Sequence, residues 1–414
     1  MTAATLLTNA RLFTAVDERV TENAALWLED GRVRYAGPMQ ALPAEVPQQS
    51  TPTVQVTNVG GRFVMPGMTE THAHLSFADA SPFAIGATGV EEATITAVSN
   101  ASLMLRSGFT SAVSFGSTHN IDVALRAAIA SGRIEGPRLL AAGQDLGATA
   151  SNVDSSGALS QIADGPWAVR KAVREQRRLG VDIVKTFLDG EAINPTNPPG
   201  ELSFTDEEVS AIVDEAKRRR LRVACHARSA GAVKQAVRAG VELIGHANYL
   251  DDEAVDLLAG ANDHVFVGPA LAWEINYLEK CETLGVSRET VIKQGYLAEI
   301  EATQVSVEKL RKAEVKLVVG GDYGISIAPH GTYAADLEYF VTYFDMRPAE
   351  ALICATRNGG LAADPQGGRG TLVEGSLADL VIVDGDPLTD IRILQDHSKL
   401  TVLKGGLAPG GSAL

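Results

Sequence analysis

Cysteine is scarce in this sequence, and the cysteines that are present have no regular spacing. The 414 residues include three of them, Cys225, Cys281 and Cys354. An odd number of distant cysteines without a Cys-x-x-Cys pair argues against a disulfide framework and against a cysteine-based zinc site. We therefore expect the protein to reside in a reducing compartment, the cytoplasm.

Long apolar runs and basic blocks are also missing. No run reaches the roughly 18 apolar residues that a membrane span requires, and the start, MTAATLLTNARLF, lacks the basic and apolar stretches of a signal peptide. The formal net charge is -15, whereas phosphate binding depends on clustered Lys and Arg. We expect a small-molecule substrate and no nucleic-acid or membrane partner.

What the chain has is the composition of a globular protein. Hydrophobic residues make up 45% and charged residues 21% of the sequence, which allows a large core. The length corresponds to roughly two to three average domains, although single α/β barrels often reach about 250 residues.

The two ends of the chain show the same β pattern. Residues 4–37 and 371–405 read as short strands separated by Gly and Asp turns. Neither end alone has enough strands for a stable sheet. We therefore predict one small β-sandwich domain built from both termini, residues 1–62 plus 371–414.

Between the ends, apolar strands alternate with amphipathic helices. Eight strands are predicted, at 63–72, 110–116, 138–144, 182–188, 222–228, 243–249, 264–270 and 316–322. Helices are predicted between them, for example at 166–179, 206–220 and 231–239. Eight repeats indicate an α/β fold of the (β/α)8 TIM-barrel type over 63–370. An open doubly wound sheet is the alternative, but a G-x-G-x-x-G turn after the first strand is missing.

Polar side chains stand near the carboxyl ends of several predicted strands, where barrel enzymes have their active sites. Residues two apart on a strand face the same side, so His72 and His74 can hold one cation together. His226, His246 and Asp322 occupy equivalent strand ends, and imidazole suits zinc and related ions. The aspartate can serve as a metal ligand or as a base.

Lys185 is the unusual member of this group. An ammonium offers only hydrogen-bond donors and cannot bind a metal. The side chain either reaches the rim of the barrel or takes up CO2, which converts the amine into a carbamate able to bridge two ions.

Together these residues resemble the binuclear metal-dependent hydrolases of the amidohydrolase superfamily, in its prolidase-like and imidazolonepropionase-related branch. The resemblance covers nearly the whole chain, and the segments that carry it include VMPGMTETHAHL, GVDIVKTFLDG, VACHARSAGAVKQAVRAGVELIGHANYLDDE, VVGGDYG, PHGTYAADLEYF and GSLADLVIVDGDPLTDI.

The resemblance implies two divalent ions, which we expect to be zinc. His72, His74 and Asp322 would bind the more buried ion, His226 and His246 the other, and carboxylated Lys185 would bridge them. A hydroxide between the ions would attack a carbonyl carbon. Asp322 would accept its proton and pass it to the leaving nitrogen.

Three further residues are expected to contact the substrate. Arg228 has the parity of His226, so its guanidinium should face the mouth of the barrel and suit a carboxylate or carbonyl, or else form a structural salt bridge. Tyr323 follows the aspartate directly, and His330 lies in the loop after the eighth predicted strand. Two longer segments, 190–204 and 273–305, are expected to cover and line the pocket.

The most direct function is hydrolysis of an amide-like C–N bond in a dipeptide, an N-acyl amino acid, or an aryl amide, carbamate or urea. The same centre could attack a phosphotriester, lactone or cyclic amidine. A non-catalytic scaffold is disfavoured because no ligand is missing from the set. We also expect a homo-oligomer.

Overall fold

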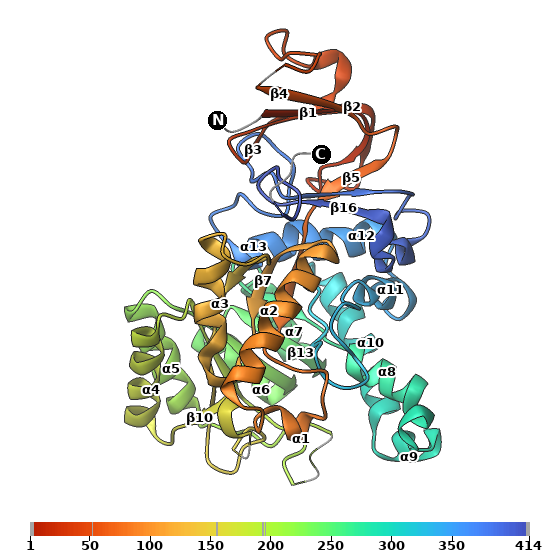
Figure 1. Ribbon diagram of the computed structural model, residues 1–414. Coiled ribbons are helices and arrows are strands. Elements are labelled where there is room, and N and C mark those ends of the chain that lie inside the picture. Colours follow the sequence, from red (N-terminus) through yellow and green to blue (C-terminus); the bar gives the residue numbers. More distant parts are fainter. Residues whose placement is uncertain (1–3, 52, 155, 193, 195, 411–414) are drawn as a thin grey trace.

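Both ends of the chain contribute strands to one small sheet, which lies at one end of a larger α/β part (Figure 1). The structure is a computed structural model that describes residues 4–51, 53–154, 156–192, 194 and 196–410. Its three cysteines are buried and unpaired, as expected. Among the described residues, no helix combines the length and the apolar character that a membrane crossing requires.

The terminal sheet confirms the prediction of a small β domain built from both ends, but only in part. Its strands form one hydrogen-bonded sheet in the order β16-β15-β5-β1-β2-β3, with β4 also paired to β1, where two packed sheets were predicted. The strands are β1 Ala4–Phe13, β2 Val20–Glu29, β3 Arg32–Pro38, β4 Val54–Asn58, β5 Phe63–Pro66, β15 Leu380–Val383 and β16 Leu400–Leu403.

The predicted strand 63–72 is wrong as a single element, because the chain changes partners at Gly67. Residues 63–66 form β5 of the terminal sheet, whereas β6, Met68–Ala73, belongs to the α/β part. The Gly67 N–H donates to the Asp379 carbonyl at 2.9 Å, and the next N–H donates to the Gly108 carbonyl. A Cβ at position 67 would lie 2.0 Å from Thr110 Oγ1, so the crossing needs glycine. The domain boundaries 1–62 plus 371–414 and 63–370 stay a prediction.

The α/β part contains two parallel sheets. One has the order β6-β7-β8 and the other the order β10-β9-β11-β12-β13-β14. Their remaining strands are β7 Phe109–Ser114, β8 Arg138–Leu140, β9 Asp145–Gly147, β10 Ser160–Ile162, β11 Ile183–Phe187, β12 Arg222–Ser229, β13 Leu243–Tyr249 and β14 Phe266–Gly268. Strands at or near seven of the eight predicted positions thus form parallel sheets, although the predicted strand 138–144 is shortened to β8.

The predicted strand 316–322 is irregular, and only Leu317 forms a bridge. Its backbone nevertheless links the two sheets. Val318 N–H donates to the Val267 carbonyl of β14 at 3.0 Å, and the Val319 carbonyl accepts from Thr71 of β6 at 3.2 Å. Asp322, the last residue of the segment, adopts a left-handed φ of 60°. The described residues therefore form two parallel sheets linked by an irregular segment, and the predicted closed barrel of eight regular strands is confirmed only as an α/β fold with parallel sheets.

Helices lie between and around the strands, as Figure 1 shows. The predicted helix 166–179 is confirmed to the residue, and the helix at 206 opens with a capping box between Thr205 and Glu208. The helices are α1 Pro82–Ile85, α2 Val90–Arg106, α3 Ile121–Ala130, α4 Pro166–Leu179, α5 Asp206–Arg218, α6 Ala230–Ala239, α7 Asp252–Gly260, α8 Ala272–Lys280, α9 Arg288–Lys293, α10 Tyr296–Lys312, α11 Ala335–Thr342, α12 Pro348–Ile353 and α13 Gly359–Ala363.

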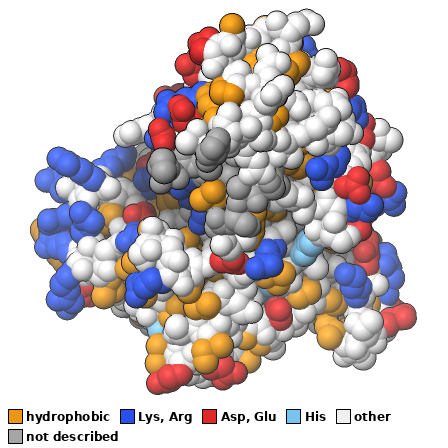
Figure 2. All heavy atoms as spheres, turned by 45° about the horizontal axis from the view of Figure 1, so that its top comes forward, with side chains coloured by type: hydrophobic (Ala, Val, Ile, Leu, Met, Phe, Trp, Pro, Cys, Tyr) orange, Lys and Arg blue, Asp and Glu red, His pale blue; other side chains and the backbone are white. Residues whose placement is uncertain are grey.

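Lys and Arg side chains gather at one side of the molecule (left edge of Figure 2), the side on which α4 and α5 lie in Figure 1. This basic surface was not expected, because the sequence contains no block of consecutive Lys and Arg residues. Several of its arginines pair with acidic residues of α5, for example Arg174 with Glu215 at 2.9 Å and Arg218 with Asp214 at 3.1 Å. Part of the positive charge is thus neutralised within the protein.

A partly buried ion pair joins the terminal sheet to the α/β part. Arg138 of β8 donates two hydrogen bonds, at 2.6 and 2.9 Å, to Asp379 just before β15. Asp379→Asn should lower the free energy of unfolding by about 1–3 kcal/mol, because the guanidinium loses its charged partner. Urea unfolding measures this change. In the control Asp384→Asn, loss of the exposed pair with Lys399 should leave stability almost unchanged. Equal effects of the two substitutions would contradict the prediction.

Candidate metal centre

Three neighbouring parallel strands bring Lys185, His226 and His246 together. Phe187 of β11 pairs with His226 of β12, and Ala227 pairs with His246 of β13. Since the strands run in register, their carboxyl ends meet at one side of the sheet. His246 has a left-handed φ of 81°, a strained conformation of the kind found at functional sites.

His72, His74 and Asp322 form the first group of ligand atoms. Asp322 Oδ1 lies 3.1 Å from His74 Nε2 and 3.7 Å from His72 Nε2. The other ring nitrogen of His74, Nδ1, lies 3.0 Å from the Gly116 carbonyl. That contact fixes the tautomer in which Nδ1 donates and Nε2 is free to bind a cation.

His226 and His246 form a second group, joined by Glu191, which was not among the predicted ligands. The three residues each offer a ligand atom within 4.8 Å of the others. The ring centroids of His226 and His246 lie 4.4 Å apart, and His246 lies 5.1 Å from His72 of the first group. The two groups are therefore neighbours, as a binuclear centre requires.

Lys185 is buried in the same region. Its side chain is 1% exposed, and Nζ lies 4.3 Å from the centroid of the Phe187 ring and 5.0 Å from that of Phe115. The lysine does not reach the solvent-exposed rim, so that alternative from the sequence is not supported.

Burial disfavours the charged form of three of the histidines, and the contacts of Asp322 with His72 and His74 favour its ionised form. Burial lowers the pKa of His72, His226 and His246 well below the usual range, with neighbouring positive charges adding to the effect at the last two. Burial alone would raise the pKa of Asp322, but the nearby His72 and His74 outweigh it and hold that pKa far below its ordinary value. Neutral imidazole and ionised carboxylate are the metal-binding forms.

Several of these possible ligand atoms have no hydrogen-bond partner within the described part of the chain. His72 Nδ1, His226 Nε2, both ring nitrogens of His246 and Asp322 Oδ1 have no hydrogen bond. Leaving such groups unpaired is costly in a protein interior. Histidine nitrogens and a carboxylate oxygen suit zinc and similar divalent ions, so the residues fit a metal centre.

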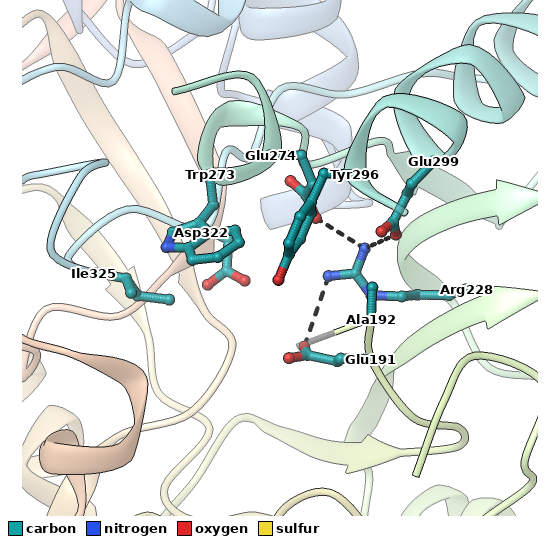
Figure 3. Close-up of a pocket in the computed structure, with 9 residues that line it drawn as sticks. All are labelled: Glu191, Ala192, Arg228, Trp273, Glu274, Tyr296, Glu299, Asp322 and Ile325. Atoms are coloured by element: carbon teal, nitrogen blue, oxygen red, sulfur yellow. Dashed lines mark hydrogen bonds and ion pairs between the residues drawn. The ribbon is translucent and has the colours of Figure 1, made fainter. Parts of the chain in front are cut away.

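A cavity opens beside these groups. It is lined by Glu191, Ala192, Arg228, Trp273, Glu274, Tyr296, Glu299, Asp322 and Ile325. Figure 3 shows Arg228 with Glu274 and Glu299 on one side and Glu191 on the other. Arg228 Nη1 donates to Glu274 at 2.9 Å and also to Glu299. Arg228 therefore lines the cavity, as its parity with His226 predicted, and it also forms a salt bridge, which was the alternative.

Three comparisons identify the family. The profile of the amidohydrolase family matches residues 63–407. The chain belongs to the amidohydrolase family. This amidohydrolase is 29% identical to an ochratoxinase of Aspergillus niger, over 94% of the chain and 83% of that protein. It is 27% identical to an imidazolonepropionase of Maricaulis maris, over 92% of each.

Solved structures agree with this assignment. A prolidase in complex with N-methylphosphonate-L-proline superposes with a TM-score of 0.85 at 27% identity, over 98% of this chain and 99% of that one. The ochratoxinase of A. niger superposes with a TM-score of 0.86 at 25% identity, over 98% and 95%. The predicted resemblance is thereby confirmed, and the amidohydrolase is an enzyme of the hydrolase class.

Two predicted substrate contacts are turned inward in this amidohydrolase. The Tyr323 hydroxyl donates to Asp336 at 3.0 Å, and the side chain is 1% exposed. His330 places Nδ1 2.7 Å from the Tyr333 hydroxyl and Nε2 3.1 Å from the Phe77 carbonyl. Neither residue lines the cavity. Their roles at the substrate stay predictions, whereas Tyr323 shares Asp336 with the Gly320 N–H, just before Asp322.

The three glutamates of the cavity were missed from the sequence. Glu274 and Glu299 come from α8 and α10, inside the segment 273–305 that was expected to line the pocket. Glu191 lies in the loop 190–204, of which residues 193 and 195 lie outside the described residues. Each lies in a segment rich in polar residues, so the sequence does not separate it from the other polar residues of that segment. Only its position beside Arg228 in the folded protein does so.

A layer of buried carboxylates lies close to the ligands and orients them. Glu70 Oε1 accepts a hydrogen bond from the His72 N–H at 2.9 Å, and Asp336 accepts one from the Gly320 N–H at 3.0 Å. Burial and the nearby Asp336 raise the pKa of Glu70 well above its usual value. Burial likewise raises the pKa of Asp336 to about 7. These contacts hold the two chain segments that carry His72 and Asp322.

Gly320 tests how closely these segments pack. A Cβ at this position would lie 2.9 Å from the backbone nitrogen of His72, and backbone cannot move aside as a flexible side chain does. Gly320→Ala should therefore displace His72 and weaken metal binding at least about tenfold. Metal content after dialysis, measured by plasma mass spectrometry, reports the loss. The control Gly260→Ala, with open space around its added Cβ, should bind metal normally. Full metal retention by Gly320→Ala would refute the prediction.

Proposed function

We propose that this amidohydrolase is a binuclear metal-dependent enzyme that hydrolyses an amide-like C–N bond. The observation that carries the proposal is the pair of adjoining groups of possible ligand atoms, several of them buried and without a hydrogen-bond partner among the described residues. The parallel strands and the linking segment 316–319 support a distorted (β/α)8 barrel as the scaffold.

His72, His74 and Asp322 would hold one ion, and His226 and His246 the other, with Lys185 as a bridging carbamate. Two divalent ions bound there, for which we propose zinc, would lower the pKa of water and polarise the substrate carbonyl. The burial of Lys185 beside these groups supports the carbamate, because a charged ammonium among metal ligands would repel the ions.

Asp322 is the proposed proton carrier. It lines the cavity, its side chain is 17% exposed, and its carboxylate stays ionised beside His72 and His74. An ionised carboxylate at this place can accept the proton of the attacking water and deliver it to the leaving nitrogen. The left-handed backbone of Asp322 aims the side chain from the end of segment 316–322 toward the ligands.

The substrate is a small molecule that fits the cavity and carries an amide-like bond. The similarity to an ochratoxinase and to a prolidase supports a linear amide. The similarity to an imidazolonepropionase favours a cyclic amidine as the second candidate. Phosphotriesters and lactones are electrophiles that the same centre could attack. Cytoplasmic location and assembly into a homo-oligomer remain predictions.

A substrate panel on the zinc-loaded enzyme tests this function. Dipeptides, N-acyl amino acids and aryl amides should be hydrolysed, whereas lactones and phosphotriesters should react more slowly. Asp322→Asn should lower kcat by about 10²–10⁴-fold, because the amide cannot accept the proton. Chelation should abolish turnover, and zinc should restore it. An enzyme that hydrolyses the lactones fastest, or an unchanged kcat in the Asp322→Asn variant, would overturn the proposal.

The carbamate on Lys185 makes a separate prediction. Metal-free protein reconstituted with zinc in CO2-depleted buffer should regain less activity than protein reconstituted with bicarbonate, since the carbamate must form before the second ion is held. The variant Lys185→Gln should show no response to bicarbonate. Equal recovery of the wild type with and without bicarbonate would contradict a carboxylated lysine.

A further inference from the structure

Glu191 is the cavity residue whose position calls for a role of its own. Its Oε1 lies 3.5 Å from His226 Nδ1, and Glu191, His226 and His246 each place a ligand atom within 4.8 Å of the other two. The separation of 3.5 Å between these two atoms is close to the one expected for two ligands of the same ion, whose metal–ligand distances are about 2.0–2.2 Å.

His246 points independently to a ligand at this place, whereas the unpartnered nitrogen of His226 is Nε2 and not the Nδ1 that faces Glu191. Both side chains are 1% exposed, and His226 Nε2 and both ring nitrogens of His246 have no hydrogen-bond partner among the described residues. With the proposed carbamate of Lys185, the two histidines supply three ligands. A glutamate would add a fourth, the number that zinc usually takes in proteins.

The nearby arginine does not account for Glu191. Arg228 Nη2 lies 3.7 Å from Glu191 Oε1, which is too long for a hydrogen bond. Arg228 Nη1 is bonded instead to Glu274 and Glu299, whose side chains are 3% and 1% exposed. The carboxylate of Glu299 is enough to balance the guanidinium, so a charged Glu191 is in excess unless a cation lies on its other side.

We propose that Glu191 is a protein ligand of the second metal ion, the ion held by His226 and His246. The inference deepens the proposed function and rests on its binuclear centre. Arg228 restrains the carboxylate from the side of the cavity, while the ion binds it from the side of the histidines. The second ion thus carries one more negative charge than the predicted ligand set supplies.

Metal titration of the full-length protein tests this assignment without any substrate. Metal-free wild type, Glu191→Gln and Glu191→Ala are titrated with Co²⁺ and followed by calorimetry and by visible absorption, which reports the coordination of each ion. The wild type should bind two ions. Both variants should bind the first ion normally and the second at least about tenfold more weakly, with an altered spectrum for the second equivalent.

Glu201→Gln is the matched control, because Glu201 is an exposed carboxylate in the same loop and should bind both ions like the wild type. Urea unfolding of the metal-free proteins checks that the substitutions leave the fold intact, as expected for a partly exposed residue. Wild-type affinity and an unchanged second spectrum in both Glu191 variants would overturn the assignment.

The outcome is separable from that of the proposed function. A wild type that binds two ions but hydrolyses no amide would remove the proposed reaction, and weakened second-ion binding in the variants would still support Glu191. A wild type that binds a single ion would overturn both, since the second ion itself would be missing. Amide hydrolysis with unaltered ion binding in the variants would remove only the role of Glu191.

Discussion

The candidate metal centre depends on buried histidine nitrogens that have no hydrogen-bond partner among the described residues. His72, His226 and His246 keep their rings neutral in a dry interior, where an unpaired polar nitrogen costs free energy. The fold tolerates this because the ligands stand on parallel strands whose backbone hydrogen bonds hold them in place. A bound cation would satisfy these nitrogens, so metal binding and folding are thermodynamically linked.

Precise placement of the ligands comes from groups that are not ligands themselves. Glu70 holds the backbone of His72, the Gly116 carbonyl orients His74, and Asp336 holds the turn before Asp322. Tyr323 belongs to this layer, since its hydroxyl donates to Asp336. Such surrounding contacts set ligand orientation and basicity in metal sites. They also explain why glycine is needed at position 320, where a chain segment passes against His72.

Much of this centre could be predicted from the sequence, because the parity of His72 and His74 and the strand-end positions of His226, His246 and Asp322 are local properties. Helix α4 was likewise determined by its own periodicity. The pairing partners of a strand are not local. Residues 63–66 look like the start of the barrel strand, but they pair with β1 and with β15, over 300 residues away. Tyr323 and His330 failed to reach the cavity because their direction depends on Asp336 and Tyr333, which no spacing rule identifies.

Charge balance connects the metal centre to the cavity. The guanidinium of Arg228 is surrounded by Glu274, Glu299 and Glu191, and burial raises the pKa of Glu274 to about 8 despite that neighbour. A substrate carboxylate bound directly to Arg228 would add another negative charge to this cluster, with Nη1 already occupied. The positive charge that could attract such a group would then have to come from the proposed ions, beyond Glu191. The ring centroids of Trp273 and Tyr296 lie 5.2 Å apart at the cavity. These aromatic side chains would then contact the apolar remainder of the substrate, and this contact would orient the scissile bond toward Asp322.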